Sequence, residues 1–472
     1  QELRIVADMA AQVAVMYAGE IVEQASRAAC FADPKHPYSQ KLLSSLPGNK
    51  KRGEPLEVIR GTVPPLNRPF EGCRFANRCD SAWERCEQVI PHWTPLDDGG
   101  VRCHLAEMPE KHAENPQKTA EPVPYSEIPP FAAATECNNF GDNETQLLQV
   151  SHLEVHFPIR KGFFKRVVGH VKAVDGISLK VDAGRTGALV GESGCGKTTV
   201  AKAILQLIPQ SAGSILFDSE DLAALSGEAL RKKRRDFQII FQDPYSSLNP
   251  RMRVGDILKE GVMALKVLTH EEKGEGWIDD LLDQVGLPPD AKHRYPHEFS
   301  GGQRQRICIA RVLAVQPKLI VCDEPTSALD GSVQAQVLNL LKDLQETYGL
   351  AYLFITHDLS IVDYFAHEVA VMYLGRIVEY GTVEAVLGNP KHPYTRALLS
   401  AVPQIDPKKK KKVIRIEGDL PSPINPPKGC FFHPRCPMVM PICREEYPDA
   451  TLLNQSHQTS CFIYTGLGPV TE

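Results

Sequence analysis

Two patterns of apolar residues alternate along the chain from about residue 147. Short runs in which nearly every residue is apolar, such as TGALV and LIVC, predict buried strands, whereas apolar residues three and four positions apart predict helices. Because the two alternate, we expect an α/β core with a mostly parallel sheet and with its chemistry at the strand ends. The runs predicted as strands are 171–181, 186–192, 237–242, 317–325 and 350–358, and those predicted as helices are 198–208, 304–315 and 334–349.

The beginning of the chain repeats its end. The segment VAVMYAGEIVEQ at 13–24 returns as VAVMYLGRIVEY at 369–380, and PKHPYSQKLLSSLP at 34–47 returns as PKHPYTRALLSAVP at 390–403. The copies align without a gap at an offset of 356, which indicates duplication. Residues 106–146 between them are rich in Pro, Glu, Ala and Asn and follow no helix or strand period, which is typical of a flexible linker.

Composition excludes several classes of protein. The 472 residues are too many for a single core, and no run of 18 apolar residues predicts a membrane-spanning helix. With 42% hydrophobic residues, 24% charged residues and a net charge of −5, the chain lacks the basic excess that nucleic-acid binding demands. The basic runs RKKRR (231–235) and KKKKK (408–412) are therefore interpreted as solvated surface.

The segment GESGCGKT fits the phosphate-binding pattern G-x-x-x-x-G-K-[ST] between a predicted strand and a predicted helix. Glycines allow backbone N–H groups to close around phosphates, and the helix N-terminus adds its positive dipole end. Lys197 is expected to reach the β and γ phosphates of ATP, and Thr198 to coordinate Mg²⁺. The predicted nucleotide-binding residues of this loop are Gly191, Glu192, Ser193, Gly194, Cys195, Gly196, Lys197, Thr198 and Thr199.

Two adjacent carboxylates, Asp323 and Glu324, end the apolar run LIVCDEP. Burying both is costly unless a cation or a water network uses them. Asp323 suits the coordination shell of Mg²⁺, and Glu324 suits a base for an attacking water.

Four further motifs give the chain a family resemblance. EFSGGQRQR (298–306) resembles the signature sequence of ABC-type ATPases, FQDP (241–244) their Q-loop, SALD (327–330) their D-loop and ITHD (355–358) their switch-histidine loop. The motifs stand in the family's order. The resemblance implies a P-loop ATPase core with a helical signature subdomain.

The resemblance also implies roles for individual residues. Gln242 would touch Mg²⁺ or the lytic water and relay to a membrane partner, and His357 would contact the γ phosphate. The residue that stacks on adenine stays open, with His170 and Phe164 as candidates. The residues implied to close on a nucleotide held by an opposing subunit are Ser300, Gly301, Gly302 and Gln303, and Asp330 is implied as a further nucleotide contact.

Eight of the thirteen cysteines occupy matching positions of the two copies. The intervening residues number 5, 6 and 16 in the first set and 5, 6 and 17 in the second. Structural zinc prefers two tight pairs, so these wide gaps favour a cysteine-ligated cluster, with zinc as the alternative; a reducing compartment disfavours disulfides. The sets are Cys73, Cys79, Cys86 and Cys103, and Cys430, Cys436, Cys443 and Cys461; Cys30, Cys137, Cys195, Cys308 and Cys322 have no matched partners.

The HPY segments, the run GDLPSPINPP (418–427) and the cysteine sets together resemble the C-terminal extension of ATP-binding subunits of dipeptide and oligopeptide ABC importers. Some members carry a 4Fe-4S cluster there, so the resemblance implies one cluster per extension. It also implies two transmembrane permease subunits, an extracytoplasmic substrate-binding protein, a second ATPase core and a peripheral place on the cytoplasmic face of the inner membrane. The alternatives are a soluble ABC ATPase of DNA repair or translation, and an importer ATPase for glutathione or a chelated metal.

The repeat predicts a fusion of two such ATPases, of which the front of the first is missing. The alignment places Gln1 opposite His357, so the first copy has glutamine where the switch histidine belongs. The expected segments are a remnant of the first ATPase core at 1–29, the first cysteine-rich extension at 30–105, the linker at 106–146, a complete core at 147–389 and the second extension at 390–472.

Overall fold

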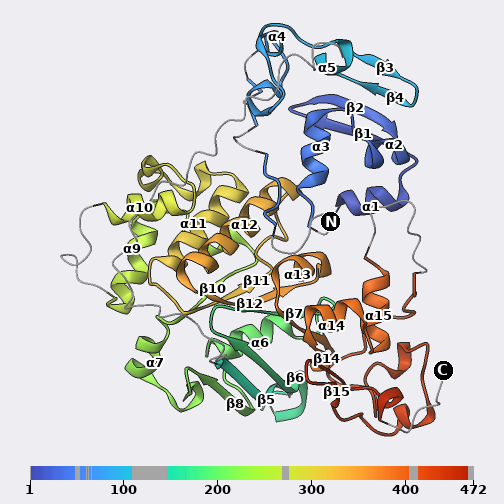
Figure 1. The fold of residues 1–472 in the computed structure, drawn as a ribbon. Helices are drawn as coiled ribbons and strands as arrows, with labels where there is room; N and C mark the ends of the chain where they lie inside the picture. Colours follow the sequence, from blue (N-terminus) through green and yellow to red (C-terminus); the bar gives the residue numbers. More distant parts are fainter. Residues whose placement is uncertain are drawn as a thin grey trace. The chain divides into compact units, whose positions relative to one another are not determined.

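The computed structural model describes residues 2–47, 54–108 and 146–465, apart from 60, 62, 65, 68, 165, 268–275 and 403–412 (Figure 1). Contacts divide the described residues into two compact units, a first up to residue 108 and a second from residue 146. Gln1, most of the predicted linker and the run at 408–412 lie outside the described residues.

An eight-stranded sheet forms the centre of the second unit, in the order β10-β11-β12-β7-β13-β14-β16-β15. The first five strands run parallel and the last three pair antiparallel. Every residue of β7, β11 and β12 is buried, which explains their uninterrupted apolar runs. The strands are β7 (Thr186–Val190), β10 (Phe237–Ile240), β11 (Leu319–Asp323), β12 (Ala351–Thr356), β13 (Glu368–Tyr373), β14 (Arg376–Thr382), β15 (Thr451–Asn454) and β16 (His457–Thr459).

Helices cover both faces of this sheet and confirm the predicted α/β core. Leu189 of β7 packs among residues of α6, whereas its neighbours Ala188 and Val190 pack with residues of α13, so the two helices lie on opposite faces (Figure 1). The helices predicted from the sequence correspond to α6, α11 and α12. The helices of this unit are α6 (Lys197–Ile204), α7 (Gly227–Lys233), α8 (Pro244–Ser247), α9 (Val254–Leu265), α10 (Trp277–Gln284), α11 (Gly301–Leu313), α12 (Gly331–Tyr348), α13 (Leu359–Phe365), α14 (Val383–Gly388) and α15 (Pro393–Ser400).

A second, wholly antiparallel sheet, in the order β6-β5-β8-β9, adds to the predicted parallel one. The run predicted as a strand at 171–181 belongs to it. Along β5 and β6 buried and exposed residues alternate over long stretches, as in sheets with one solvated face. The mostly parallel sheet that we expected is thus one of two sheets in the core. The strands are β5 (Gln146–Lys161), β6 (Arg166–Asp182), β8 (Ala212–Phe217) and β9 (Glu220–Asp221).

The first unit repeats the end of the second in three dimensions. Its sheet has the order β1-β2-β4-β3, which matches β13-β14-β16-β15, and Gln12 pairs with Ser26 as Glu368 pairs with Thr382. Strand β13 also pairs with β7, whereas β1 is the edge of its sheet among the described residues. The elements are α1 (Glu2–Met9), β1 (Gln12–Tyr17), β2 (Glu20–Ser26), α2 (Arg27–Ala32), α3 (Pro37–Ser44), α4 (Glu84–Gln88), β3 (Thr94–Leu96), β4 (Gly99–Val101) and α5 (His104–Glu107).

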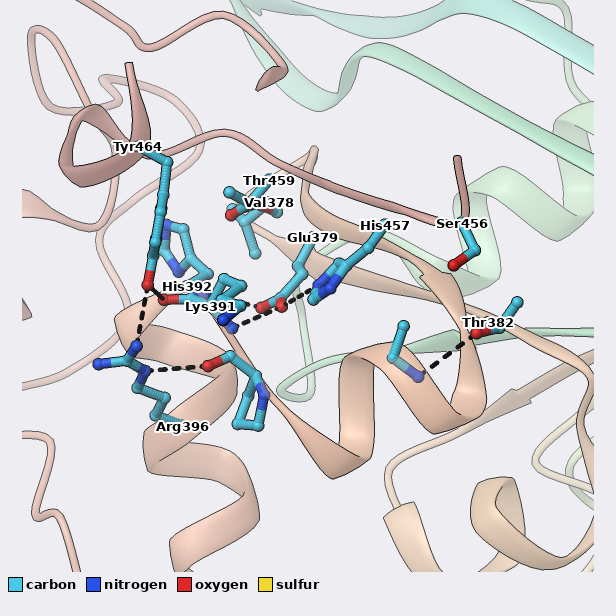
Figure 2. A network of polar contacts seen from close by, with 12 residues as sticks. Val378, Glu379, Thr382, Lys391, His392, Arg396, Ser456, His457, Thr459 and Tyr464 are labelled. Carbon is cyan, nitrogen blue, oxygen red and sulfur yellow. Dashed lines mark hydrogen bonds and ion pairs between the residues drawn. The ribbon is translucent and has the colours of Figure 1, made fainter. Parts of the chain in front are cut away.

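A buried carboxylate holds the HPY turn in each unit. Glu379 accepts hydrogen bonds from the backbone N–H groups of Lys391 (2.7 Å) and His392 (2.8 Å), and its Oε1 lies 2.7 Å from Nε2 of His457 (Figure 2). His392 Nδ1 then accepts from Tyr394 N–H at 3.1 Å and caps α15, with the intervening proline at the first helical position. The HPY motif is therefore a helix start that is bound to a strand.

The first unit has the same arrangement. Glu23 accepts from the backbone N–H groups of Lys35 (2.7 Å) and His36 (3.0 Å), and His36 Nδ1 accepts from Tyr38 N–H (3.0 Å). A buried carboxylate needs such partners, because an unpaired one is costly away from water.

We predict that Glu379→Ala lowers the stability of the second unit by about 2–4 kcal/mol, because it leaves two buried backbone donors and a buried imidazole without an acceptor. The measurement is the thermal or urea unfolding midpoint followed by circular dichroism. Glu446→Ala, at an exposed position of the same extension, is the matched control and should change the midpoint little. Equal midpoints for the two variants would contradict the role assigned to Glu379.

Candidate nucleotide-binding site

The loop between β7 and α6 has the backbone shape that a phosphate cradle requires. Gly191, Gly194 and Gly196 have φ values of +156°, +84° and +112°. A Cβ atom on Gly196 would lie 2.2 Å from the carbonyl oxygen of Ala173, so no larger residue fits there without displacing β6. The buried Lys197 Nζ donates to the carbonyl oxygens of Gly191 (2.8 Å) and Glu192 (3.0 Å). The side chain of Lys197 therefore folds back over the loop that the sequence motif predicts to bind phosphate.

Thr198 and Asp323 meet beside this loop. Thr198 Oγ1 donates to Asp323 Oδ1 at 3.3 Å, although the two residues are far apart in the sequence. Burial raises the pKa of Asp323, and the neighbouring Glu324 adds to the effect, whereas Thr198 and Lys197 oppose it. A hydroxyl and a carboxylate that lacks solvent are oxygen ligands suited to Mg²⁺.

Glu324 connects three neighbouring strand ends. Its Oε2 accepts from Gln242 Nε2 at 2.9 Å, and its Oε1 lies 3.1 Å from His357 Nδ1. The hydrogen bond to His357 lowers the pKa of Glu324 and raises the pKa of His357, so the carboxylate is ionised at neutral pH. Glu324 also has φ of +49°, a left-handed conformation that non-glycine residues rarely adopt and that concentrates at functional sites.

The signature residues form a second group at the start of α11. Ser300 caps this helix, and its N–H donates to Gln303 Oε1 at 3.0 Å. A Cβ atom on Gly302 would lie 2.3 Å from Val333 of α12, so α11 and α12 touch at this glycine. Asp330 caps α12 by accepting from Val333 N–H at 2.9 Å. Within the described residues, no hydrogen bond joins the signature residues to the phosphate-binding loop.

The residue that stacks on adenine stays a prediction. His170 is an exposed residue of β6, three positions before Ala173. Phe164 is 81% exposed and contacts Phe163 edge to face, in the turn between β5 and β6. Of the two, His170 is the nearer along β6 to the point where Ala173 touches the phosphate-binding loop.

Each cysteine set lines one cavity. Each cavity has a volume of only about 10 Å³, and each is also lined by the histidine of the HPY turn. Burial raises the pKa of Cys79, Cys103 and Cys430 to about 12, and neighbouring cysteines of the same set add to the rise. Nonetheless, no three His, Cys, Asp or Glu side chains among the described residues are arranged to hold a metal ion.

Two contacts to the phosphate-binding loop were not predicted. The backbone N–H of Glu192 donates to Tyr394 Oη at 3.0 Å, and the Glu192 carboxylate pairs with Arg435 at 2.9 Å. Tyr394 belongs to the repeated HPY segment, but nothing in the sequence singled it out or indicated its partner.

Comparison with known proteins decides the family. The family model described as "ABC transporter" matches residues 174–327, and the model described as "Oligopeptide/dipeptide transporter, C-terminal region" matches 22–86 and 378–443. The oligopeptide transport ATP-binding protein AppF of Bacillus subtilis is 48% identical over 326 residues, which are 68% of this chain and 99% of AppF. The chain belongs to the ATP-binding proteins of oligopeptide and dipeptide ABC transporters.

Two more sequence relatives and one solved structure are similar to parts of this chain. The di/tripeptide transport ATP-binding protein DppF of Pseudomonas aeruginosa is 48% identical over 67% of this chain and 97% of its own length. The glutathione import ATP-binding protein GsiA of Pectobacterium atrosepticum is 41% identical over 90% of this chain, which spans 58% of GsiA. A solved structure, CbiO1 of Clostridium perfringens, has a TM-score of 0.45 and 28% identity over 52% of this chain and 92% of its own.

Within the described residues, no helix is both long and apolar enough to cross a membrane.

We predict that Glu324→Gln lowers the pKa of His357, because the hydrogen bond to an ionised carboxylate is the largest cause of its elevation. The measurement is an NMR titration of histidine-labelled protein, with His357→Gln to identify the resonance. Glu346→Gln, at an exposed position of α12, should leave that titration unchanged. The assignment fails if the His357 pKa is the same in Glu324→Gln and the parent.

Proposed function

We propose that this chain is the ATP-hydrolysing subunit of an importer of dipeptides or oligopeptides. The observation that carries the proposal is the contact of Glu324 with Gln242 and His357, beside the pair Thr198–Asp323 and the P-loop lysine. The sequence relatives supply the substrate class, since AppF and DppF are named for oligopeptide and for di/tripeptide transport. GsiA, named for glutathione import, aligns over most of this chain and makes glutathione, itself a small peptide, the second candidate substrate.

The residues divide the work of hydrolysis. Lys197 and the N–H groups of the loop bind the phosphates, and Thr198 and Asp323 would hold Mg²⁺, which when bound would neutralise charge on the transferred phosphoryl group. Glu324 accepts a proton from the attacking water, which Gln242 and His357 help to position. Glu324 raises the pKa of His357, and His357 would also contact the γ phosphate.

The signature residues suit pairing of this ATPase core with a second one. Ser300, Gly301, Gly302 and Gln303 are bonded to their own helix and not to the P-loop of this core, and we propose that they close on a nucleotide held by a second ATPase core. Two transmembrane permease subunits, an extracytoplasmic substrate-binding protein and a peripheral place on the inner membrane belong to the same proposal. So do the five segments 1–29, 30–105, 106–146, 147–389 and 390–472.

We predict that Lys197→Ala loses ATP binding, whereas Glu324→Gln binds ATP but hydrolyses it about 10²–10⁴-fold more slowly, because only the proton-accepting step is removed. The measurements are nucleotide affinity by fluorescence and phosphate release. Equal nucleotide affinity for Lys197→Ala and the parent would remove the basis of the assignment.

For the cysteine sets we propose one 4Fe-4S cluster each, held by Cys73, Cys79, Cys86 and Cys103 and by Cys430, Cys436, Cys443 and Cys461. A cluster would give each extension a one-electron redox centre. Zinc binds sulfur at about 2.3 Å and so draws its ligands tightly together. A cluster accepts thiolates that are farther apart, and the four cysteines of each set line one cavity.

A buried nitrogen supports this fit. His36 lines the first cysteine cavity, and its Nδ1 accepts from Tyr38 N–H, so its proton is on Nε2. Nε2 is buried and has no hydrogen-bond partner among the described residues. A donor without a partner is costly there, and a sulfur-rich anionic group in the cavity would accept its hydrogen bond.

We predict about four iron and four sulfide per cysteine set in anaerobically purified protein. Cys436→Ser and Cys79→Ser should each remove roughly half of both, because each acts on one set. Iron and acid-labile sulfide are measured chemically, and Cys308→Ser, a buried cysteine outside both sets, is the control. Stoichiometric zinc without sulfide in protein never exposed to oxygen would favour the alternative.

A further inference from the structure

Glu192, the second residue of the P-loop, is held from three directions. Its backbone N–H donates to Tyr394 Oη (3.0 Å), and its carboxylate pairs with Arg435 (2.9 Å). Its carbonyl oxygen accepts from Lys197 Nζ (3.0 Å). Tyr394 and Arg435 belong to the extension that follows the ATPase core, so a single residue connects this extension to the phosphate-binding lysine.

The pair Arg435–Glu192 is well shielded from water. The Arg435 side chain is 9% exposed and the Glu192 side chain 27%, so solvent screens their attraction less than it screens a surface pair. Arg435 NH1 also lies 3.4 Å from Tyr373 Oη. The guanidinium therefore contacts both the loop and a tyrosine of β13.

The extension holds its two contact residues rigidly. Tyr394 is fully buried, with its ring centroid 4.8 Å from that of Tyr373 and 5.4 Å from that of Phe432. The start of its helix is bound to Glu379 through His392 (Figure 2). Arg435 immediately precedes Cys436, and the turn that presents the arginine runs between two cysteines of the second set, with His433 N–H donating to the carbonyl oxygen of Cys430 at 3.0 Å.

The first unit contains the same structure with another partner. Tyr17, Tyr38 and Phe75 form the equivalent ring cluster, with centroids 4.7 to 5.4 Å apart. Arg78, the counterpart of Arg435, donates to Tyr17 Oη (3.1 Å) and to the carbonyl oxygen of Ile59 (3.2 Å) in its own unit. Both extensions therefore contain this arginine. In the second extension it pairs with a carboxylate of the P-loop.

We propose that the second cysteine-rich extension is a positioning element of the nucleotide site, in which Arg435 and Tyr394 hold Glu192 and thereby set the affinity of the P-loop for ATP. The inference rests on the proposed ATP-binding function. A loop held in its binding shape loses less conformational freedom when nucleotide binds, so releasing it weakens binding. Disruption of the second cysteine set should act through the same residues.

The test compares nucleotide affinity with turnover in the full chain. Arg435→Met should weaken binding of a fluorescent Mg-ATP analogue about tenfold and raise KM for ATP similarly, while kcat at saturating ATP changes less than twofold, because Glu324 and His357 are not touched. Arg435→Lys should recover most of the affinity, since it keeps the charge. Arg78→Met is the matched control and should bind as the parent does.

A double-mutant cycle separates this contact from a general loss of packing. Glu192→Gln should weaken binding as Arg435→Met does, and the double variant should be no weaker than either, because both remove one interaction. Unchanged or tighter binding by Arg435→Met, an equal effect of Arg78→Met, or additive losses would overturn the proposal. Failure of the parent to bind nucleotide, or binding by Lys197→Ala equal to the parent's, would overturn the proposed function instead.

Discussion

The buried carboxylate of Glu379 is the interaction on which the second extension depends. It accepts two backbone N–H groups of the HPY turn, and that turn starts α15 through His392 Nδ1. Two residues later Tyr394 reaches the N–H of Glu192 in the P-loop. Each step needs the previous one, because a tyrosine hydroxyl meets a given peptide only if its helix starts at a fixed place. Strand β14, which is separated from β7 by one strand, thus helps to fix the loop that cradles phosphate.

Two adjacent carboxylates acquire opposite properties at the end of β11. Asp323 is the last strand residue and is buried, so desolvation raises its pKa. Glu324 turns out of the strand with φ of +49° and meets His357, which lowers its pKa. When the environments of two titratable groups shift their pKa values in opposite directions, the two groups commonly have different chemical roles. Here the buried carboxylate suits a cation, and the ionised one suits a proton acceptor.

The sequence was sufficient where the signal is local. Uninterrupted apolar runs predicted β7, β11 and β12, and the glycine spacing predicted a phosphate-binding loop, in which three glycines have positive φ. The antiparallel pairing of β6 with β5 was not predicted, because a single strand does not specify its neighbour. The contacts of Glu192 join residues more than 200 positions apart. The spacing of apolar residues does not predict contacts between residues so far apart. The repeated HPY segment showed only that this part of the chain is duplicated.

The two copies of the cysteine-rich extension share some contacts and differ in others. The carboxylate, the capping histidine, the ring cluster and the arginine recur in both units. The sheet registers place Gly99 opposite Ala25 where His457 stands opposite Gly381, so the second unit adds an imidazole to its buried carboxylate. The edge differs as well, since Met16 is 61% exposed and its counterpart Met372 is buried against the core. Glu379 has His457 as an extra partner, and Arg435 has Glu192. Both contacts occur in the copy that is attached to the ATPase core. The attachment of the second extension to the nucleotide site therefore uses a tyrosine and an arginine whose counterparts, Tyr38 and Arg78, are also present in the first unit.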